Sequence, residues 1–268
     1  LVRQSMMGRR FSASGRGVIV PEPDLAPDEI FLPLTQFAGM LSGARDIRNR
    51  LSARCEDRFF FERLQEWMEP APLAEAACAL DGMLRTEPVW CLMIRQPSLH
   101  RHSVQAFRVR IWEKSVIGMP PLSTAGFNAD FDGDTMAVFL PPEPYAQDLS
   151  RFSLLENPGI VGTGAPAFAT GLDLALGWNA LSSEEKAVFF EEAGCPFDPS
   201  MSFKKFFSKL LRALGKHPVD ERRASLRTLQ KEVCRASTGQ ASLGPAVFQR
   251  LCDAFRARFQ DDIHGFAK

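Results

Sequence analysis

The sequence has no net charge, no C-x-x-C cysteine pair and no apolar run long enough to form a membrane-spanning helix. Its 268 residues include 32 basic and 32 acidic side chains, and 45% of the residues are hydrophobic. A chain without a run of about 18 apolar residues is not expected to contain a transmembrane helix. This composition is typical of a globular chain with one large core or two smaller ones, and it excludes collagen-like, disordered and strongly charged classes.

Cysteine clusters of the kind that bind zinc are also missing. The six cysteines lie far apart in the sequence and have no close histidine partners, whereas a zinc site needs clustered ligands. In a chain of this length an even number of cysteines does not by itself indicate disulfides. We therefore expect buried free thiols and an intracellular, reducing compartment: the cytoplasm of a bacterium or of a phage-infected cell, or an organelle such as a plastid. The cysteines are Cys55, Cys78, Cys91, Cys195, Cys234 and Cys252.

The chain divides by pattern into a basic N-terminal strand, a helical part, a β-rich part and a second helical part. Because it begins with Leu1, we expect a trimmed, processed or partial product. Residues 1–24 carry arginines before any acid and then a β-branched run, Val18–Val20, which prolines end. Residues 34–87 are predicted to be mainly helical.

Residues 88–142 favour a compact β-barrel or sandwich. Short apolar or alternating runs are separated there by proline, glycine and charged turns, a pattern typical of closely connected strands. The runs are Val89–Ile94, Ala106–Trp112, Val116–Met119 and Met136–Leu140.

From about residue 172 onward the pattern is helical again. Ser182 and Glu185 have the spacing of a capping box. Apolar residues between Phe203 and Leu214 recur at helical spacing, and those between Phe248 and Phe259 repeat the pattern. We interpret these aromatic stripes as core-facing rather than as part of a cofactor site.

One segment carries chemistry: Asn128-Ala129-Asp130-Phe131-Asp132-Gly133-Asp134. In an extended chain, carboxylates at every second position project to one face. Gly133 allows the backbone to bend so that the three carboxylates converge. Converging carboxylates repel one another unless a cation is bound, so the segment predicts a site for a hard cation, most plausibly Mg²⁺.

Two other interpretations of this segment compete. An EF-hand calcium loop shares the three aspartates but needs glycine at its sixth position and glutamate at its twelfth, which here are Thr135 and Pro141. An ordinary acidic turn is the default for a bare D-x-D pair. Three acids with a glycine inside an apolar segment make that second interpretation weaker.

The heptad resembles the metal-binding signature of the largest, β′-type subunit of multisubunit DNA-directed RNA polymerases. Three further stretches are similar to that family in order and approximate spacing. Arg95–Phe107 resembles its Arg-x-Pro-Thr-Leu-His-Arg…Gln-Ala-Phe stretch, Met119–Leu122 its approach to the heptad, and Arg3–Ile19 its Arg-Gln…Gly-Lys-Arg…Ser-Gly-Arg segment. The good coverage spans residues 3 to about 142, and the match at Thr238–Gly244 is weak.

The resemblance implies an α+β fold with one double-psi β-barrel. Residues 1–24 and 88–145 would form this catalytic barrel, residues 25–87 a mainly helical insertion and residues 146–268 a helical C-terminal region. A split subunit or a fragment of the β′ type would account for the length.

The resemblance also implies roles for individual residues. Asp130, Asp132 and Asp134 would be the catalytic residues and the ligands of Mg²⁺. Arg95 and Asn128 match positions that bind the incoming nucleotide, and Arg10 and Arg16 match basic positions near the nucleic acid. The chain departs from the family at Ile94 and Gln96, beside Arg95, which affects the expected contacts to the ribose.

The implied function is nucleotidyl transfer of nucleoside triphosphates onto an RNA 3′ end on a DNA template, only within an assembly. The partners would be a β-type subunit with a second barrel, the remaining β′ parts, α-type assembly subunits, template DNA and RNA, and no membrane. Two alternatives are a non-catalytic structural or nucleic-acid-binding relative within a larger complex, and a stand-alone metal-dependent nuclease or phosphatase.

The zero net charge does not argue against these nucleic-acid partners once it is examined locally. Residues 201–235 carry ten Lys and Arg against three acids, and residues 1–24 are basic as well. Opposite local charges therefore cancel in the total, and three of the acids belong to the predicted metal site.

Overall fold

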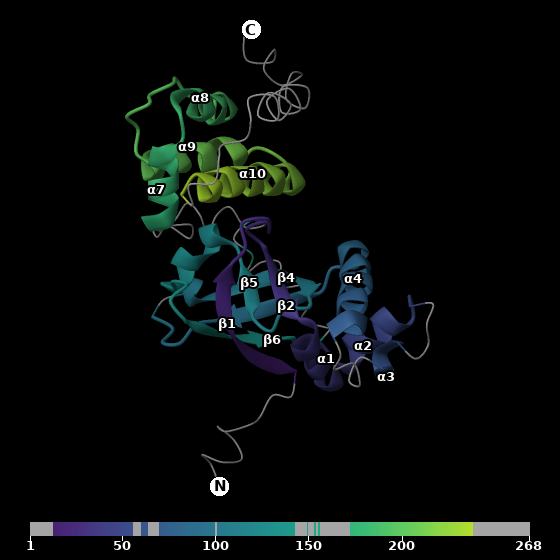
Figure 1. Cartoon of the computed structure of the whole chain (residues 1–268). Helices are drawn as coiled ribbons and strands as arrows, with labels where there is room; N and C mark the ends of the chain where they lie inside the picture. The colour runs from purple at the N-terminus through teal and green to yellow at the C-terminus, as the bar shows by residue number, and fades with distance from the viewer. Residues whose placement is uncertain are drawn as a thin grey trace. The chain divides into compact units, whose positions relative to one another are not determined.

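The computed structural model describes residues 13–55, 60–63, 70–99, 101–142, 149, 153, 155 and 172–237. The chain divides into two compact units, residues 1–169 and residues 170–268. The first contains the strands and the second contains helices, and Figure 1 labels the elements of both. The repeated aromatic stripe at Phe248–Phe259 and the weak match at Thr238–Gly244 lie outside the described residues.

Six strands of the first unit close into a barrel in the order β1-β5-β2-β4-β3-β6. Parallel pairs join β1 to β5 and β2 to β4, and the remaining neighbours are antiparallel. This is the predicted double-psi β-barrel within an α+β fold. The strands are β1 (Ser14–Pro21), β2 (Glu29–Pro33), β3 (Trp90–Ile94), β4 (Val104–Trp112), β5 (Ile117–Met119) and β6 (Thr135–Phe139).

Four of these strands coincide with the predicted apolar runs, and β1 contains the predicted β-branched run. Strand β2 differs, because it lies inside the range 25–87 that we expected to be a helical insertion. It pairs with β4 from Glu29 opposite Arg108 to Pro33 opposite Trp112, so it is an integral strand of the barrel. The helical segment between barrel strands therefore begins at Leu34, directly after β2.

The helices between β2 and β3 pack against the barrel and share its core. They are α1 (Leu34–Gly43), α2 (Arg45–Ser52), α3 (Phe60–Arg63) and α4 (Pro70–Thr86). In Figure 1 they gather together beside the strands. Phe37 of α1 and Leu80 of α4 belong to the same buried cluster as Ile30 of β2 and Val138 of β6, so barrel and helices form one hydrophobic core.

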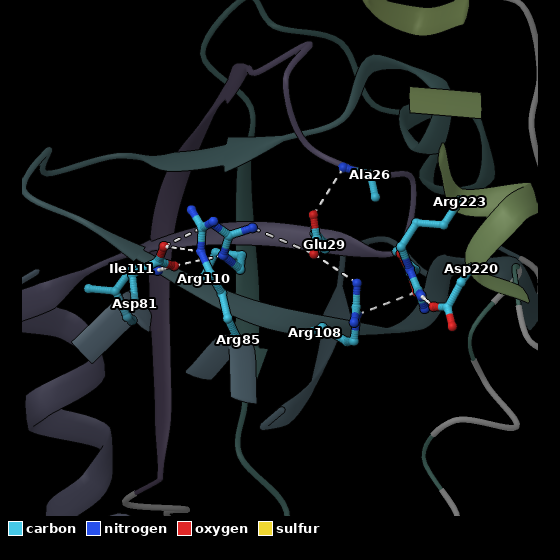
Figure 2. Close-up of polar contacts among 10 residues, drawn as sticks. Ala26, Glu29, Asp81, Arg85, Arg108, Arg110, Ile111, Asp220 and Arg223 are labelled. Atoms are coloured by element: carbon cyan, nitrogen blue, oxygen red, sulfur yellow. Dashed lines mark hydrogen bonds and ion pairs between the residues drawn. The ribbon is translucent and has the colours of Figure 1, made fainter. Parts of the chain in front are cut away.

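A buried ion network attaches α4 to the barrel. Asp81 of α4 accepts two hydrogen bonds from the guanidinium of Arg110 on β4, at 2.7 and 2.8 Å, and one from the backbone N–H of Ile111 at 3.1 Å. Figure 2 shows Arg110 between Asp81 and Glu29. Glu29 of β2 lies 3.6 Å from the Arg110 guanidinium and accepts a hydrogen bond from Arg108 at 2.8 Å.

The second unit consists of α7 (Leu172–Ala180), α8 (Ser183–Glu192), α9 (Phe203–Leu214) and α10 (Val219–Ser237). The capping box predicted at Ser182 and Glu185 is confirmed, with both reciprocal hydrogen bonds formed. The aromatic stripe of α9 is also confirmed as core, because Phe203, Phe206 and Phe207 are buried. Trp178 of α7 stacks on Phe206 with a centroid distance of 4.5 Å.

Two expectations from composition have clear outcomes. Within the described part of the chain the cysteines are free thiols, as predicted. Cys91 is buried, Cys55, Cys195 and Cys234 are partly buried, and Cys78 is exposed, so the expectation of a buried thiol was wrong for Cys78. Cys252 lies outside the described residues. Burial raises the pKa of the Cys91 thiol. Among the described residues no helix is both long enough and apolar enough to cross a membrane.

Candidate metal centre

The predicted metal-binding segment lies on the loop between a 3-10 helix, η3 (Pro121–Phe127), and strand β6. Asn128 ends η3 in a left-handed conformation with φ of 50°, and its N–H donates to the carbonyl of Ala125 at 3.1 Å. The N–H of Ala129 donates to the carbonyl of Thr124 at 3.2 Å. The start of the loop is therefore fixed to the end of η3.

A bend at Gly133 brings the last aspartate to the other two. Asp130 and Asp132 are exposed, and Phe131 between them is partly buried against the barrel core. Gly133 has φ of +120°, which L side chains rarely adopt. The predicted bend at Gly133 is thus confirmed, whereas residues 130–134 form a loop and not an extended strand.

Each of the three aspartates offers a carboxylate oxygen within 4.8 Å of the oxygens of the other two. A hydrogen bond with Asp132 raises the pKa of the Asp130 carboxyl above its ordinary value, and the charges of Asp132 and Asp134 add to this shift. Like charges at this separation disfavour the ionised form. The arrangement is a set of hard oxygen donors, the type that Mg²⁺ and Ca²⁺ prefer.

Asp134 is the most firmly held of the three. Its carboxylate accepts two hydrogen bonds from the Arg95 guanidinium, from Nε at 2.8 Å and from Nη2 at 3.2 Å, and a third from the N–H of Asp130 at 3.3 Å. The hydrogen bonds from Arg95 lower the pKa of the Asp134 carboxyl below its ordinary value. The Asp134 carbonyl accepts from the N–H of Ile19 on β1 at 3.0 Å.

The remaining predicted site residues are Arg16, Asn128 and Arg10. Arg16 on β1 is exposed and donates from Nε to Oγ1 of Thr135, the residue that follows Asp134, at 3.0 Å. Asn128 is exposed two residues before Asp130. Arg10 lies outside the described residues.

Sequence reasoning missed two supports of the loop. Thr135 binds Arg16, and nothing in the local sequence pattern distinguishes it from other strand residues. Phe131 anchors the loop, and its signal was available, because one large apolar residue alternating with aspartates indicates a loop with one buried and one exposed side.

The fold and this loop define a class: a double-psi β-barrel that carries three clustered carboxylates on the loop preceding its last strand. Residues 75–149, which include that loop, match the family model described as RNA polymerase Rpb1, domain 2. The chain also resembles curated proteins named DNA-directed RNA polymerase subunit beta′. It is 33% identical over 189 residues to the one from Acholeplasma laidlawii, which covers 68% of this chain and 13% of that protein.

Two further relatives of the same name give similar figures. The identity is 34% over 177 residues for the subunit of Roseiflexus castenholzii, covering 65% of this chain and 11% of that protein. For the subunit of Petrotoga mobilis the identity is 34% over 192 residues, covering 70% of this chain and 11% of that protein. The chain thus spans only about an eighth of the length of these relatives. The matched part of the chain is a segment of the β′ type, related to the largest subunit of multisubunit RNA polymerases.

Proposed function

We propose that this chain is the catalytic-barrel segment of a multisubunit DNA-directed RNA polymerase and transfers nucleotides from triphosphates to an RNA 3′ end. One observation carries the proposal. The loop on which Asp130, Asp132 and Asp134 gather their carboxylates lies inside the stretch that matches the Rpb1 domain 2 family. Fold, acidic cluster and family therefore coincide at one place in the chain.

The donor set fits a magnesium ion. Carboxylate oxygens are the ligands that this hard cation prefers, and three of them on one loop compensate its charge. Asp130, Asp132 and Asp134 would hold the ion. When bound, Mg²⁺ supplies charge stabilisation to the attacking and leaving oxygens of an in-line phosphoryl transfer.

The surrounding residues of the chain would bind and orient the substrates. Arg95 and Asn128 would donate hydrogen bonds to the sugar hydroxyls of the incoming nucleotide, because a guanidinium and an amide can both donate to a 2′-OH. Arg10 and Arg16 would position nucleic-acid phosphates by charge. Arg16 is suited to this role because its side chain is exposed, and among the described residues its hydrogen bond to Thr135 uses Nε and leaves the two terminal nitrogens for a phosphate.

The proposal requires partner chains. The relatives are about eight times longer than the segment that they match, so most of a β′-type subunit lies outside the matched segment. We propose that a β-type subunit, the remaining β′ parts and α-type subunits complete the assembly, which acts on template DNA and RNA in an intracellular compartment. A chain of this length is then inert on its own.

Native purification of the tagged chain tests this dependence. We expect β-type and further β′-type chains to copurify, and the eluate to extend an RNA primer on a DNA template when Mg²⁺ is present. The purified 268-residue chain alone is expected to show neither RNA synthesis nor hydrolysis of nucleic acid. Turnover of nucleic acid by the isolated chain would support a stand-alone nuclease or phosphatase instead, and an assembly without polymerase chains would support the non-catalytic alternative.

A further inference from the structure

Arg95 forms an ion pair with Asp134, one of the three proposed metal ligands. Both oxygens of the Asp134 carboxylate accept hydrogen bonds from the guanidinium, at 2.8 and 3.2 Å. Only 20% of the Arg95 side chain and 22% of the Asp134 side chain are exposed. A two-bond pair with this degree of burial is stronger and better oriented than a surface ion pair.

The barrel brings the two residues close together at the ends of two neighbouring strands. Arg95 directly follows β3, whose last residue, Ile94, pairs with Ala137 of β6. Asp134 directly precedes β6, and its carbonyl is fixed to β1 by the N–H of Ile19. Since β3 and β6 are hydrogen-bonded neighbours, the pairing of Arg95 with Asp134 is a consequence of strand register rather than of a mobile surface side chain.

The guanidinium supplies the positive charge that the three carboxylates otherwise lack. Asp130 and Asp132 each offer an oxygen within 4.8 Å of the Asp134 oxygens, so the cluster carries three negative charges in a small volume. Arg95 neutralises one of them. A divalent cation that binds the same three residues needs an oxygen of Asp134, and it would also be repelled by a guanidinium that stays in place.

We propose that the Arg95 guanidinium pairs with the Asp134 carboxylate when no metal is bound, and that it competes with the divalent metal for that carboxylate. The inference rests on the proposed function, because it presupposes that Asp130, Asp132 and Asp134 bind the metal. In the metal-free site, before any nucleotide is bound, Arg95 then has a positioning role with two consequences. It stabilises the loop when no metal is bound, and it lowers the affinity of the site for the metal by having to give up at least one hydrogen bond.

Mn²⁺ binding to the full chain, followed by the electron paramagnetic resonance signal of the free ion, tests the competition. Arg95→Gln removes the charge and the paired donors and keeps a polar side chain. Arg95→Lys keeps the charge without the planar fork. Arg16→Gln is the matched control, because it removes one nearby positive charge that binds Thr135 and not a carboxylate. Asp132→Asn reports whether the ion binds at the three aspartates at all.

We expect Arg95→Gln to bind Mn²⁺ about tenfold more tightly than the unchanged chain, since the ion no longer has to displace a charge-assisted pair. Arg95→Lys should lie between the two, and Arg16→Gln should change the affinity by less than about threefold. Without metal, Arg95→Gln should unfold at a lower temperature than the unchanged chain, and Mn²⁺ should raise its unfolding temperature by more.

The possible failures are distinguishable. If Asp132→Asn binds Mn²⁺ as tightly as the unchanged chain, the metal site of the proposed function is wrong and the competition falls with it. If Asp132→Asn abolishes binding but Arg95→Gln binds the ion equally or more weakly, the metal site stands and the competition is refuted. An equal gain in affinity for Arg16→Gln and Arg95→Gln would mean a general effect of charge, which also refutes it.

Discussion

At the scale of single residues, Gly133 gives the aspartate loop its geometry. Its φ of +120° is accessible to glycine and strained for other residues, whereas a built Cβ meets no atom within 4 Å. The requirement for glycine is therefore conformational and not a matter of space. Because the bend brings Asp134 to Asp130 and Asp132, backbone strain at this residue acts directly on the proposed metal site.

Gly133→Ala should destabilise the fold by about 1–3 kcal/mol and weaken Mn²⁺ binding, because the substituted loop relaxes away from the bend. Thermal unfolding and metal titration of the full chain measure the two effects. Gly82→Ala is the control: Gly82 lies within α4 and its built Cβ also meets nothing within 4 Å, so alanine should stabilise the helix by up to about 1 kcal/mol. Unchanged metal binding in Gly133→Ala would show that the bend is not needed.

The residue scale also shows what the sequence could and could not predict about the site. The three aspartates and the glycine were predicted because they stand together within five positions. The pairing of Arg95 with Asp134 spans 39 positions and depends on β3 lying beside β6. A contact that depends on strand register is not visible in local spacing, so the sequence singled out Arg95 without revealing its partner.

At the scale of elements, buried charges attach α4 to the barrel. Burial raises the pKa of the Asp81 carboxyl, but the hydrogen bonds from Arg110 and Ile111 and the charge of Arg110 outweigh burial, and the net pKa lies below its ordinary value. The pairing with Asp81 correspondingly raises the pKa of Arg110. Both groups are therefore charged at neutral pH, and each makes the burial of the other tolerable.

Asp81→Asn should destabilise the chain by about 3–5 kcal/mol, because it leaves the buried charge of Arg110 without its principal partner. Chemical denaturation measures the loss. Arg85→Gln is the matched control on the same carboxylate: the Arg85 side chain is 65% exposed, so its removal should cost less than about 1 kcal/mol. Equal losses for the two variants would contradict the assignment of the buried pair as the main attachment.

The same pair predicts a dependence of stability on pH. The pKa of Asp81 is lower in the folded chain than in the unfolded chain, where it is about 3.9. The contribution of the Asp81 carboxylate to the free energy of unfolding is therefore complete above the pKa of the unfolded chain. It is lost as the pH falls toward the lower pKa of the folded chain. Below about pH 4, the free energy of unfolding should fall less steeply with falling pH in Asp81→Asn than in the unchanged chain. Parallel curves would contradict this.

In the second unit, α7 approaches α10 closely at Gly177. A Cβ built on Gly177 would lie 1.9 Å from the backbone carbonyl oxygen of Val233, which cannot move aside as a side chain can. Gly177→Ala should therefore cost about 1–3 kcal/mol or more. Hydrogen exchange should become faster in α7 and α10 and stay unchanged in the barrel strands. Asn179→Ala, at an exposed position of α7, is the control. If the barrel strands also lost protection in Gly177→Ala, the division of the chain into two separate units would be contradicted.

Element prediction failed at β2 for a physical reason. Glu29–Pro33 is a five-residue strand that begins with an acid and ends with a proline, so it lacks the uninterrupted apolar run of a buried strand. Glu29 is tolerated in the barrel wall because Arg108 and Arg110 of the parallel neighbour β4 face it. The strands β3, β4 and β6 coincide with longer apolar or alternating runs and were predicted within two residues of their bounds.

At the scale of the whole molecule, the chain joins a complete barrel to a helical unit, yet it matches only 11–13% of the length of the relatives. A closed six-stranded barrel with its own core explains how so short a segment can fold. Chemistry on a template needs more surface than one barrel offers. We therefore propose that the acidic loop of this chain holds the metal and that further substrate contacts come from outside the matched segment.

RNA synthesis by the natively purified assembly with Asp132→Asn in this chain tests the central claim most directly. We predict a loss of about 10²–10³-fold in primer extension, with the same copurifying chains and an unchanged unfolding temperature. Asp198→Asn, which alters a partly exposed aspartate of the second unit whose carboxylate accepts hydrogen bonds from Ser200, should leave the rate unchanged. Primer extension at the unchanged rate by the Asp132→Asn assembly would contradict the assignment of a catalytic metal to this loop.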